Sequence, residues 1–294
     1  HSPHRPWVDS IRIECSKCGE SVPRISDVGN PWLDAGIVPF STLDYQKNRE
    51  YWSEWFPADW ISESFPGQFR NWFYSLLTMS TVLENEEPFR CVFSYALMKD
   101  EHGEEMHKSR GNAIWLDEAA EEIGIDPMRW VFMSQNPSTN LNFGYNVVAE
   151  TVRHFLLTLW NTYSFFVTYA NIDNYVPANP VSSQPKSELD RWILSELNTL
   201  ISEVTSCLDN YNSSEATKRI ESFVQGLSNW YVRRSRRRFW KSENDQDKSS
   251  AYATLYQCLV TLAKLMSRFT PFLAEEIYQN LVRQADSASP ESIH

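Results

Sequence analysis

The sequence lacks long hydrophobic runs, a surplus of positive charge and a set of cysteines suited to disulfide bonds. No run of about 18 apolar residues occurs, so we expect no transmembrane helix and no membrane partner. No signal-peptide pattern opens the chain. The net charge of −11 argues against nucleic-acid binding by bulk charge, but it does not exclude a local basic face.

The cysteines are an odd five, at positions 15, 18, 91, 207 and 258. They do not suit a disulfide framework, so we predict a protein of the reducing cytoplasm. Cys15 and Cys18, followed by Gly19, resemble a knuckle that supplies half of a zinc site. The interpretations left open are a zinc site, a β-turn with two free thiols, or a knuckle whose other ligands lie on further chain.

Aromatic residues are abundant, with 12 Trp, 13 Tyr and 16 Phe, and they predict large buried clusters or aromatic-lined pockets. A length of 294 residues suits roughly two domains. The chain begins at His1 rather than Met and ends in a Ser, Pro and Glu tail without a terminating element. We therefore expect a piece of a longer protein.

The pattern of apolar residues changes near residue 147. Before it, segments 55–61 and 90–98 suit buried strands, segments 68–83 and 116–123 suit helices, another helix begins at Asp126, and 135–144 suits a loop. After it, amphipathic helices are predicted at 147–169, 189–210, 214–240, 248–267 and 272–284, with a linker at 175–184. Long helices with short polar connections predict an antiparallel bundle.

One short tract carries chemistry suited to phosphate: Met106, His107, Lys108, Ser109, Arg110, Gly111 and Asn112. A lysine, a hydroxyl and a glycine can neutralise and approach a pyrophosphate. Residues 91–98 before it suit a buried strand, residues 100–103 a tight turn, and residues 117–124 after it a helix ended by glycine. Such flanks favour a phosphate-handling loop at a sheet edge over a solvated loop that matches by chance.

This tract resembles the Lys-Met-Ser-Lys-Ser-x-Gly-Asn loop of class I aminoacyl-tRNA synthetases. Further colinear segments resemble the isoleucyl-tRNA synthetase family: residues 4–9 (His-Arg-Pro-Trp-Val-Asp), 32–36 (Trp-Leu-Asp-Ala-Gly), 56–59 (Phe-Pro-Ala-Asp) with Glu63 and 68–73 (Gln-Phe-Arg-Asn-Trp-Phe), 159–166, and 230–240. The last of these favours the isoleucine branch over valine or leucine. The resemblance runs nearly from end to end.

The resemblance implies the second half of a Rossmann-like α/β catalytic domain, followed by an all-α anticodon-binding bundle. The implied domains are residues 1–30 (a connective strand and knuckle region), 31–147 (the catalytic half) and 148–294 (the bundle). The implied enzyme is an isoleucine–tRNA ligase. It uses ATP with Mg to form isoleucyl-adenylate and then transfers isoleucine to tRNA(Ile).

The resemblance also implies roles for single residues. Lys108 is the implied catalytic cation, and the implied ATP-binding residues are Met106, His107, Lys108, Ser109 and Gly111. Glu63, Gln68 and Trp72 would line the amino-acid and adenylate pocket. Two bland alternatives stay open: a solvated carboxylate for Glu63 and an ordinary core residue for Trp72.

The chain departs from the family pattern at several points. Glu105 and His107 stand where the loop has its first Lys and first Ser, Asn71 replaces a glycine, and residues 64–67 replace the usual Gly-x-Asp. The other ATP signature, His-Ile-Gly-His, and the editing domain have no counterpart. We therefore expect the chain alone to be inactive and to need an N-terminal catalytic half and an editing domain.

A basic segment near the end of the third predicted helix suits contact with tRNA phosphates. We predict one cationic stripe of Arg233, Arg234, Arg237 and Arg238, flanked by Arg236 and interleaved with aromatics. The alternative is a solvated face paired with carboxylates. At the level of function, the alternatives are a non-catalytic tRNA-binding paralogue and a valine- or leucine-specific sister synthetase.

Overall fold

The computed structural model describes residues 5–27, 29–177, 187–243 and 245–294. The chain divides into two compact units, His1–Ser94 and Tyr95–His294. His4 of the first family-like segment and residues 178–184 of the predicted linker lie outside the described residues. The domain limits after residues 30 and 147 stay predictions.

The first unit opens with an antiparallel hairpin of β1 (Arg12–Glu14) and β2 (Ser21–Pro23), in which Arg12 lies opposite Pro23. A second two-stranded sheet joins β3 (Ile61–Ser64) to β4 (Val92–Tyr95). The helices of this unit are α1 (Pro31–Gly36), α2 (Val38–Ser41), α3 (Arg49–Trp55), α4 (Phe65–Gln68) and α5 (Trp72–Glu84).

Aromatic stacking forms the core of this unit. The rings of Trp52 and Phe56 stack with centroids 4.5 Å apart, and Phe40 lies against both. The Trp52 indole donates a hydrogen bond to the Pro39 carbonyl at 3.1 Å. The predicted buried clusters of aromatic side chains are therefore confirmed here.

Two strand predictions for this region are wrong. Segment 55–61 is not a strand, because Trp55 ends α3 and β3 begins only at Ile61. Segment 90–98 forms two short strands, β4 and β5 (Met98–Asp100), and neither is buried. Each of these strands pairs with a single neighbouring strand, so apolar residues along them stay partly exposed.

The second unit contains β5, paired in parallel with β6 (Leu141–Phe143). Segment 135–144 is therefore not all loop, because pairing with a distant strand orders three of its residues. The helices are α6 (Leu116–Ile123), α7 (Ile125–Ser134), α8 (Tyr145–Thr151), α9 (Leu157–Ile172), α10 (Glu188–Asp209), α11 (Ser213–Gly226), α12 (Arg233–Trp240), α13 (Gln246–Met266) and α14 (Pro271–Tyr278).

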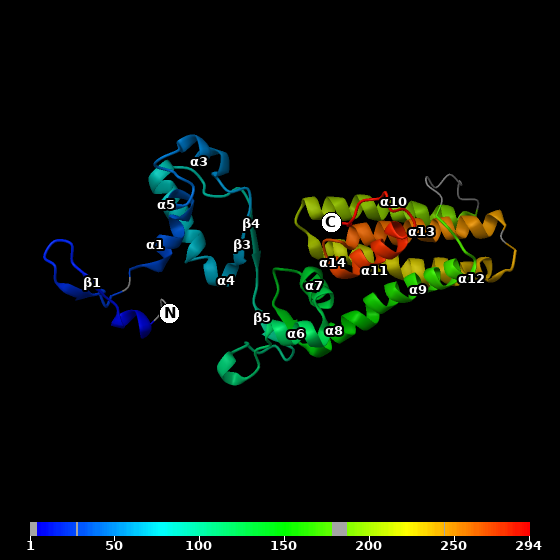
Figure 1. Cartoon of the computed structure of the whole chain (residues 1–294), viewed down its shortest axis with the longest axis horizontal. Coiled ribbons are helices and arrows are strands. Elements are labelled where there is room, and N and C mark those ends of the chain that lie inside the picture. The colour runs from blue at the N-terminus through cyan, green and yellow to red at the C-terminus, as the bar shows by residue number, and fades with distance from the viewer. Residues whose placement is uncertain (1–4, 28, 178–186, 244) are drawn as a thin grey trace. The chain divides into compact units, whose positions relative to one another are not determined.

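Within this unit the long helices α10, α11 and α13 lie side by side in a bundle, as Figure 1 shows. π-Helical segments continue α8, α11 and α14 without a break: Val152–Leu156, Leu227–Val232 and Gln279–Arg283. Polar side chains cap the helix starts, because Ser187, Asn212 and Asp245 each accept a hydrogen bond from a first-turn N–H. The predicted bundle is confirmed.

Helix α7 fastens the α/β segment of this unit to the bundle. The buried Trp130 ring stacks on Phe155 at 4.2 Å, and its indole N–H donates to Glu221 at 2.8 Å. Arg129 donates to the carbonyls of Arg268 and Phe269 at the end of α13, while the Asp126 carboxylate accepts from backbone N–H groups at the start of α14. Each charge complements the dipole of the helix end that it contacts. Across the described residues, no helix is long and apolar enough to cross a membrane.

Gly36 permits a close contact between α1 and α5 in the first unit. A Cβ built at Gly36 would lie 2.7 Å from the Ser75 carbonyl oxygen of α5, whereas one built at Gly29 would meet nothing within 4 Å. We expect Gly36→Ala to lower the free energy of unfolding by about 1–3 kcal/mol, because α1 and α5 must separate. Gly29→Ala is the matched control. Equal midpoints in denaturant melts of the two variants would contradict this packing argument.

Candidate functional site

Asp100, the last residue of β5, organises the turn before the predicted phosphate-binding tract of residues 106–112. Its carboxylate accepts from the backbone N–H groups of His102 at 3.0 Å and Glu104 at 2.9 Å. Gly103 adopts φ +85°, in the left-handed region where glycine is favoured. The predicted tight turn is confirmed. The next residue, Glu101, reaches the start of α8 and accepts from the Asn146 side chain at 3.1 Å.

Hydrogen bonds of the Asn112 side chain close residues 100–112 into a loop, called here the ring. The Asn112 side-chain NH₂ donates to the Asp100 carboxylate at 2.9 Å and to the Glu105 carbonyl at 3.1 Å, while its oxygen accepts from the His107 N–H at 2.9 Å. The hydrogen bond from Asn112, followed by that from the Glu104 N–H, holds the pKa of Asp100 below its ordinary value. Sequence reasoning placed Asn112 in the tract without a role of its own. Its place at the end of the family-like pattern is the signal that could have found it.

The ring presents a short 3₁₀ turn, Lys108–Arg110, that Gly111 ends at φ +73°. Lys108 is exposed, and its ammonium lies 4.6 Å from the centre of the Trp115 ring. Met106 is half-buried and packs against the core formed by α6, α7 and α8. Of the predicted ATP-binding residues, Lys108 thus faces solvent while Met106 fixes the base of the loop. The backbone of Ser109 belongs to the same turn.

Glu105 lies beside His107, and these two residues are the departures from the family pattern within the loop. Its carboxylate is 3.4 Å from the His107 imidazole, and both side chains are largely exposed. An acidic group therefore stands next to the turn that carries Lys108. A phosphate approaching Lys108 would bring its negative charge close to the Glu105 carboxylate. Repulsion between these charges makes phosphate binding less favourable than it would be with a lysine at position 105.

The predicted pocket residues lie in the first unit. Gln68 ends α4, and its side-chain oxygen accepts from the Trp72 N–H at 3.3 Å, at the start of α5. Glu63 lies on β3, where its carboxylate accepts from the Ser64 N–H at 2.7 Å. All three predicted side chains are half-buried. The structure therefore brings Gln68 and Trp72 together, with Glu63 on the strand that leads into α4.

Cys15 and Cys18 lie at the tip of the β1–β2 hairpin. The chain turns there through Gly19 at φ +72°, and the Gly19 N–H donates to the Cys15 carbonyl at 2.8 Å. Hydrogen bonds from the Lys17 N–H, the Cys18 N–H and the Cys18 thiol lower the pKa of Cys15. Among the residues that the structure describes, no group of three or more His, Cys, Asp or Glu could hold a metal. The zinc site stays a prediction with two ligands present.

The basic helix α12 exposes Arg233, Arg234, Arg236 and Arg237. The Arg234 guanidinium stacks over the Trp230 ring at 3.8 Å. In the described ranges, none of these four arginines forms an ion pair with a carboxylate. The alternative of a basic face neutralised by neighbouring acids is therefore not what the described residues show.

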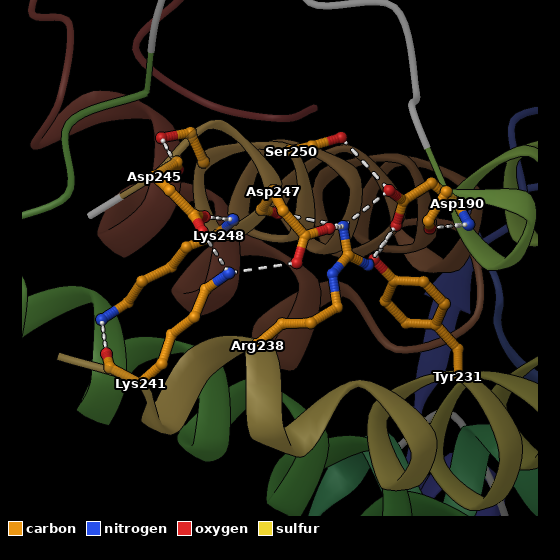
Figure 2. A network of polar contacts seen from close by, with 10 residues as sticks. Asp190, Tyr231, Arg238, Lys241, Asp245, Asp247, Lys248 and Ser250 are labelled. Carbon is orange, nitrogen blue, oxygen red and sulfur yellow. Dashed lines mark hydrogen bonds and ion pairs between the residues drawn. The ribbon is translucent and has the colours of Figure 1, made fainter. Parts of the chain in front are cut away.

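Arg238 does not lie on this stripe, and its predicted placement there is wrong. Its side chain is only 14% exposed, and its two terminal nitrogens donate to the buried Asp190 carboxylate at 2.7 and 2.8 Å. Figure 2 shows this pair inside a network of polar contacts. The pair holds α12 against α10 and occupies the donors that a phosphate would need.

Comparison with known families agrees with this geometry. Residues 4–144 match the model of tRNA synthetases class I (I, L, M and V). Residues 190–294 match the anticodon-binding domain of tRNA ligase. The α/β region that carries the ring around Lys108 and the bundle that carries α12 thus correspond to two parts of one class of enzyme.

Curated relatives narrow the class. An isoleucine–tRNA ligase of Dehalococcoides mccartyi is 49% identical over 99% of this chain, and one of Thermus thermophilus is 44% identical over the same share. The chain therefore belongs to the class I aminoacyl-tRNA synthetases, on their isoleucine–tRNA ligase branch. It spans 29% of the length of the first relative and 28% of the second.

Solved structures confirm the predicted fold class. A Mycobacterium tuberculosis methionyl-tRNA synthetase in complex with methionyl-adenylate matches with TM-score 0.70 at 20% identity, over 90% of this chain and 53% of that chain. LeuRS from Agrobacterium radiobacter K84, in a ternary complex with tRNA and LeuAMS, matches with TM-score 0.65 at 18% identity, over 92% of this chain and 34% of that chain. At these identities the likeness concerns the fold.

The ring around Lys108 depends on Asn112. We expect Asn112→Ala to speed hydrogen exchange of the His107 amide about ten- to hundredfold, because that amide loses its acceptor and the loop opens. Exchange measured by NMR or mass spectrometry in the complete protein checks this. Asn146→Ala is the matched control, since it removes a contact of the same turn outside the ring. An unchanged His107 rate in the Asn112 variant would show that the ring does not order the loop.

Proposed function

We propose that this chain supplies the second half of the catalytic domain, and part of the anticodon-binding domain, of an isoleucine–tRNA ligase. The reaction joins isoleucine to tRNA(Ile) in two steps. The isoleucine carboxylate attacks the α-phosphate of ATP, an O–P bond forms, and the bond to pyrophosphate breaks. The adenylate then passes its isoleucyl group to tRNA and releases AMP.

The ring that presents Lys108 carries this proposal. Asp100 and Asn112 hold the loop from inside, so the 3₁₀ turn needs no contact from Lys108 and leaves the ammonium exposed. A cation held on such a turn can neutralise the charge that develops on the departing pyrophosphate. Mg supplies further neutralisation when it is bound to ATP. The aromatic side chain of Trp115 holds the Lys108 ammonium near the turn until a phosphate draws the ammonium away.

The amino-acid site draws on the first unit. Glu63 offers a carboxylate to the ammonium of isoleucine, and Trp72, fixed by Gln68 at the start of α5, offers an apolar wall. The half-burial of these side chains leaves part of each available to a ligand. The chain spans less than a third of its relatives, so a complete site includes the His-Ile-Gly-His half. We place the protein in the cytoplasm, where its substrates ATP and tRNA occur.

Exposed arginines of α12 carry the proposed contact with tRNA. Arg233, Arg234 and Arg237 stand free of carboxylates among the described residues and face solvent. Guanidinium groups suit phosphate oxygens, and the net charge of −11 leaves this face as a local exception. Arg238 is not included, because Asp190 holds it.

A second candidate is a tRNA-binding paralogue without catalysis. The Glu105 and His107 pair favours it, because an acidic group replaces a cation beside the phosphate loop. A valine- or leucine-specific enzyme is the third candidate, and the identity to isoleucine–tRNA ligases weighs against it.

Isoleucine-dependent ATP–pyrophosphate exchange tests the proposal. The assay is run on this chain alone and on the chain supplied with the N-terminal catalytic half and editing domain. We expect exchange only in the second case. No exchange in a folded, complete protein would favour the tRNA-binding paralogue, and faster exchange with valine or leucine would favour a sister specificity.

Lys108→Ala in the complete protein is expected to slow pyrophosphate exchange about 10²- to 10³-fold, as when one transition-state donor is removed. Binding of tRNA should stay within about twofold, because α12 is untouched. Arg110→Ala, at the other end of the same 3₁₀ turn, is the matched control for charge and should slow exchange far less. If the two variants are equally slow, the loop acts through net charge alone and the assignment of Lys108 is wrong.

A further inference from the structure

Asp190 is buried and accepts four hydrogen bonds from three side chains. Its carboxylate accepts from Arg238 at 2.7 and 2.8 Å, from the Tyr231 hydroxyl at 2.7 Å and from the Ser250 hydroxyl at 3.1 Å. The side chain has no exposed surface. Figure 2 shows that these donors come from different elements and converge on one carboxylate. A first-turn residue of α10 thus holds the π-helical segment Leu227–Val232, α12 and α13 together.

The carboxylate remains charged in this position. Burial alone would raise the pKa of Asp190, but the hydrogen bonds from Arg238 and Tyr231 outweigh it and hold the pKa below its ordinary value. A buried charge without its partner is strongly unfavourable, so the carboxylate and guanidinium stay together. The pairing therefore resists any rotation of α12 that would draw Arg238 away.

Fixing Arg238 also fixes the directions in which the other side chains of α12 point. Arg238 follows Arg233 by five residues, which places the two side chains about 140° apart around a helix. Tyr231 and Arg238 are seven residues apart and share the inner face, where both touch Asp190. The outer face then carries the exposed Arg233 and Arg237, with Trp240 one turn further and 55% exposed.

A second set of polar interactions fixes the end of α12. Lys248 is buried, and its ammonium donates to the Lys241 carbonyl at 2.8 Å while it pairs with Asp173 at 2.7 Å. The Lys241 ammonium in turn pairs with Asp245 at 2.7 Å and Asp247 at 3.2 Å. These interactions tie the C-terminal end of α12 to the start of α13, so the helix is held at its end as well as around its axis.

We propose that Asp190 is a positioning residue for tRNA: by holding Arg238 and Tyr231, it sets the rotation at which α12 presents Arg233, Arg237 and Trp240 on its outer face. The inference rests on the proposed function, because tRNA is the ligand. The outer face combines guanidinium groups with the exposed indole of Trp240, and Arg234 stacks on Trp230 of the preceding π-helical segment. Phosphates and unpaired bases of RNA suit this combination.

The test is Asp190→Asn in the complete protein. We expect KM for tRNA in aminoacylation to rise about tenfold, because the outer arginines no longer share one orientation. Measured tRNA affinity should also fall less steeply with salt, by about 0.7–0.9 in logarithmic slope for each phosphate that the arginines no longer neutralise. Isoleucine-dependent pyrophosphate exchange should stay within about twofold, since the loop of Lys108 is unchanged.

Asp126→Asn is the matched control. Asp126 is a buried carboxylate of the same unit, and its hydrogen bonds run to backbone N–H groups of α14 rather than to α12. We expect this variant to be less stable and to keep the tRNA KM and salt slope of the parent. An equal rise of KM in both variants would overturn the inference, because general loosening would explain it. An Asp190 variant with the parent's KM and slope would overturn it as well.

Tyr231→Phe covers the case in which Asp190→Asn does not fold. It keeps the ring in the core and removes only the 2.7 Å hydrogen bond to Asp190, so a smaller rise in KM, about two- to fivefold, is expected. An unchanged KM would overturn the inference.

Failure of the proposed function looks different: the parent itself shows no isoleucine-dependent exchange. Direct tRNA binding by the parent and variants then still decides the role of Asp190.

Discussion

A negative charge lies inside the helical bundle at Asp190, and the surrounding helix ends are arranged to satisfy it. Burying a carboxylate is expensive unless donors meet it, and here a guanidinium and two hydroxyls do so. Near the end of α12, the buried Lys248 is likewise paired with an opposite charge, the carboxylate of Asp173. An apolar core would hold the same helices, but it would not fix the rotation of α12 as sharply.

The sequence predicted the helices of the bundle well, because their apolar spacing and their caps agree. Segment 189–210 became α10 (Glu188–Asp209) and segment 248–267 became α13 (Gln246–Met266). The strands were harder. Residues 141–143 become β6 only because β5 lies beside them, and no local pattern reports a partner that lies 43 residues away. Segment 55–61 failed as a strand because Trp55 and Phe56 belong to the end of α3.

The candidate site was predictable in its residue types more than in its geometry. The tract around Lys108 was recognised from its pattern, while the role of Asn112 emerged only from its hydrogen bonds. Arg238 shows the converse. Its charge suggested solvent and phosphate, but helical spacing puts it on the side of Tyr231 and Ser235, which are buried. At about 100° per residue, Arg238 lies well away from Arg233, Arg236 and Arg237, but only about 40° from Arg234, so spacing alone would not have separated it from every other arginine.

Helix α7 limits how this molecule can be divided. It belongs to the region before the bundle, yet it supplies Trp130 to the bundle core, Arg129 to the end of α13 and Asp126 to the start of α14. A fragment that begins at residue 148 would leave a hole the size of an indole and two uncapped helix ends. A fragment that keeps the core of the bundle intact must therefore start before α7. In such a fragment α7 fills the core and caps the two helix ends.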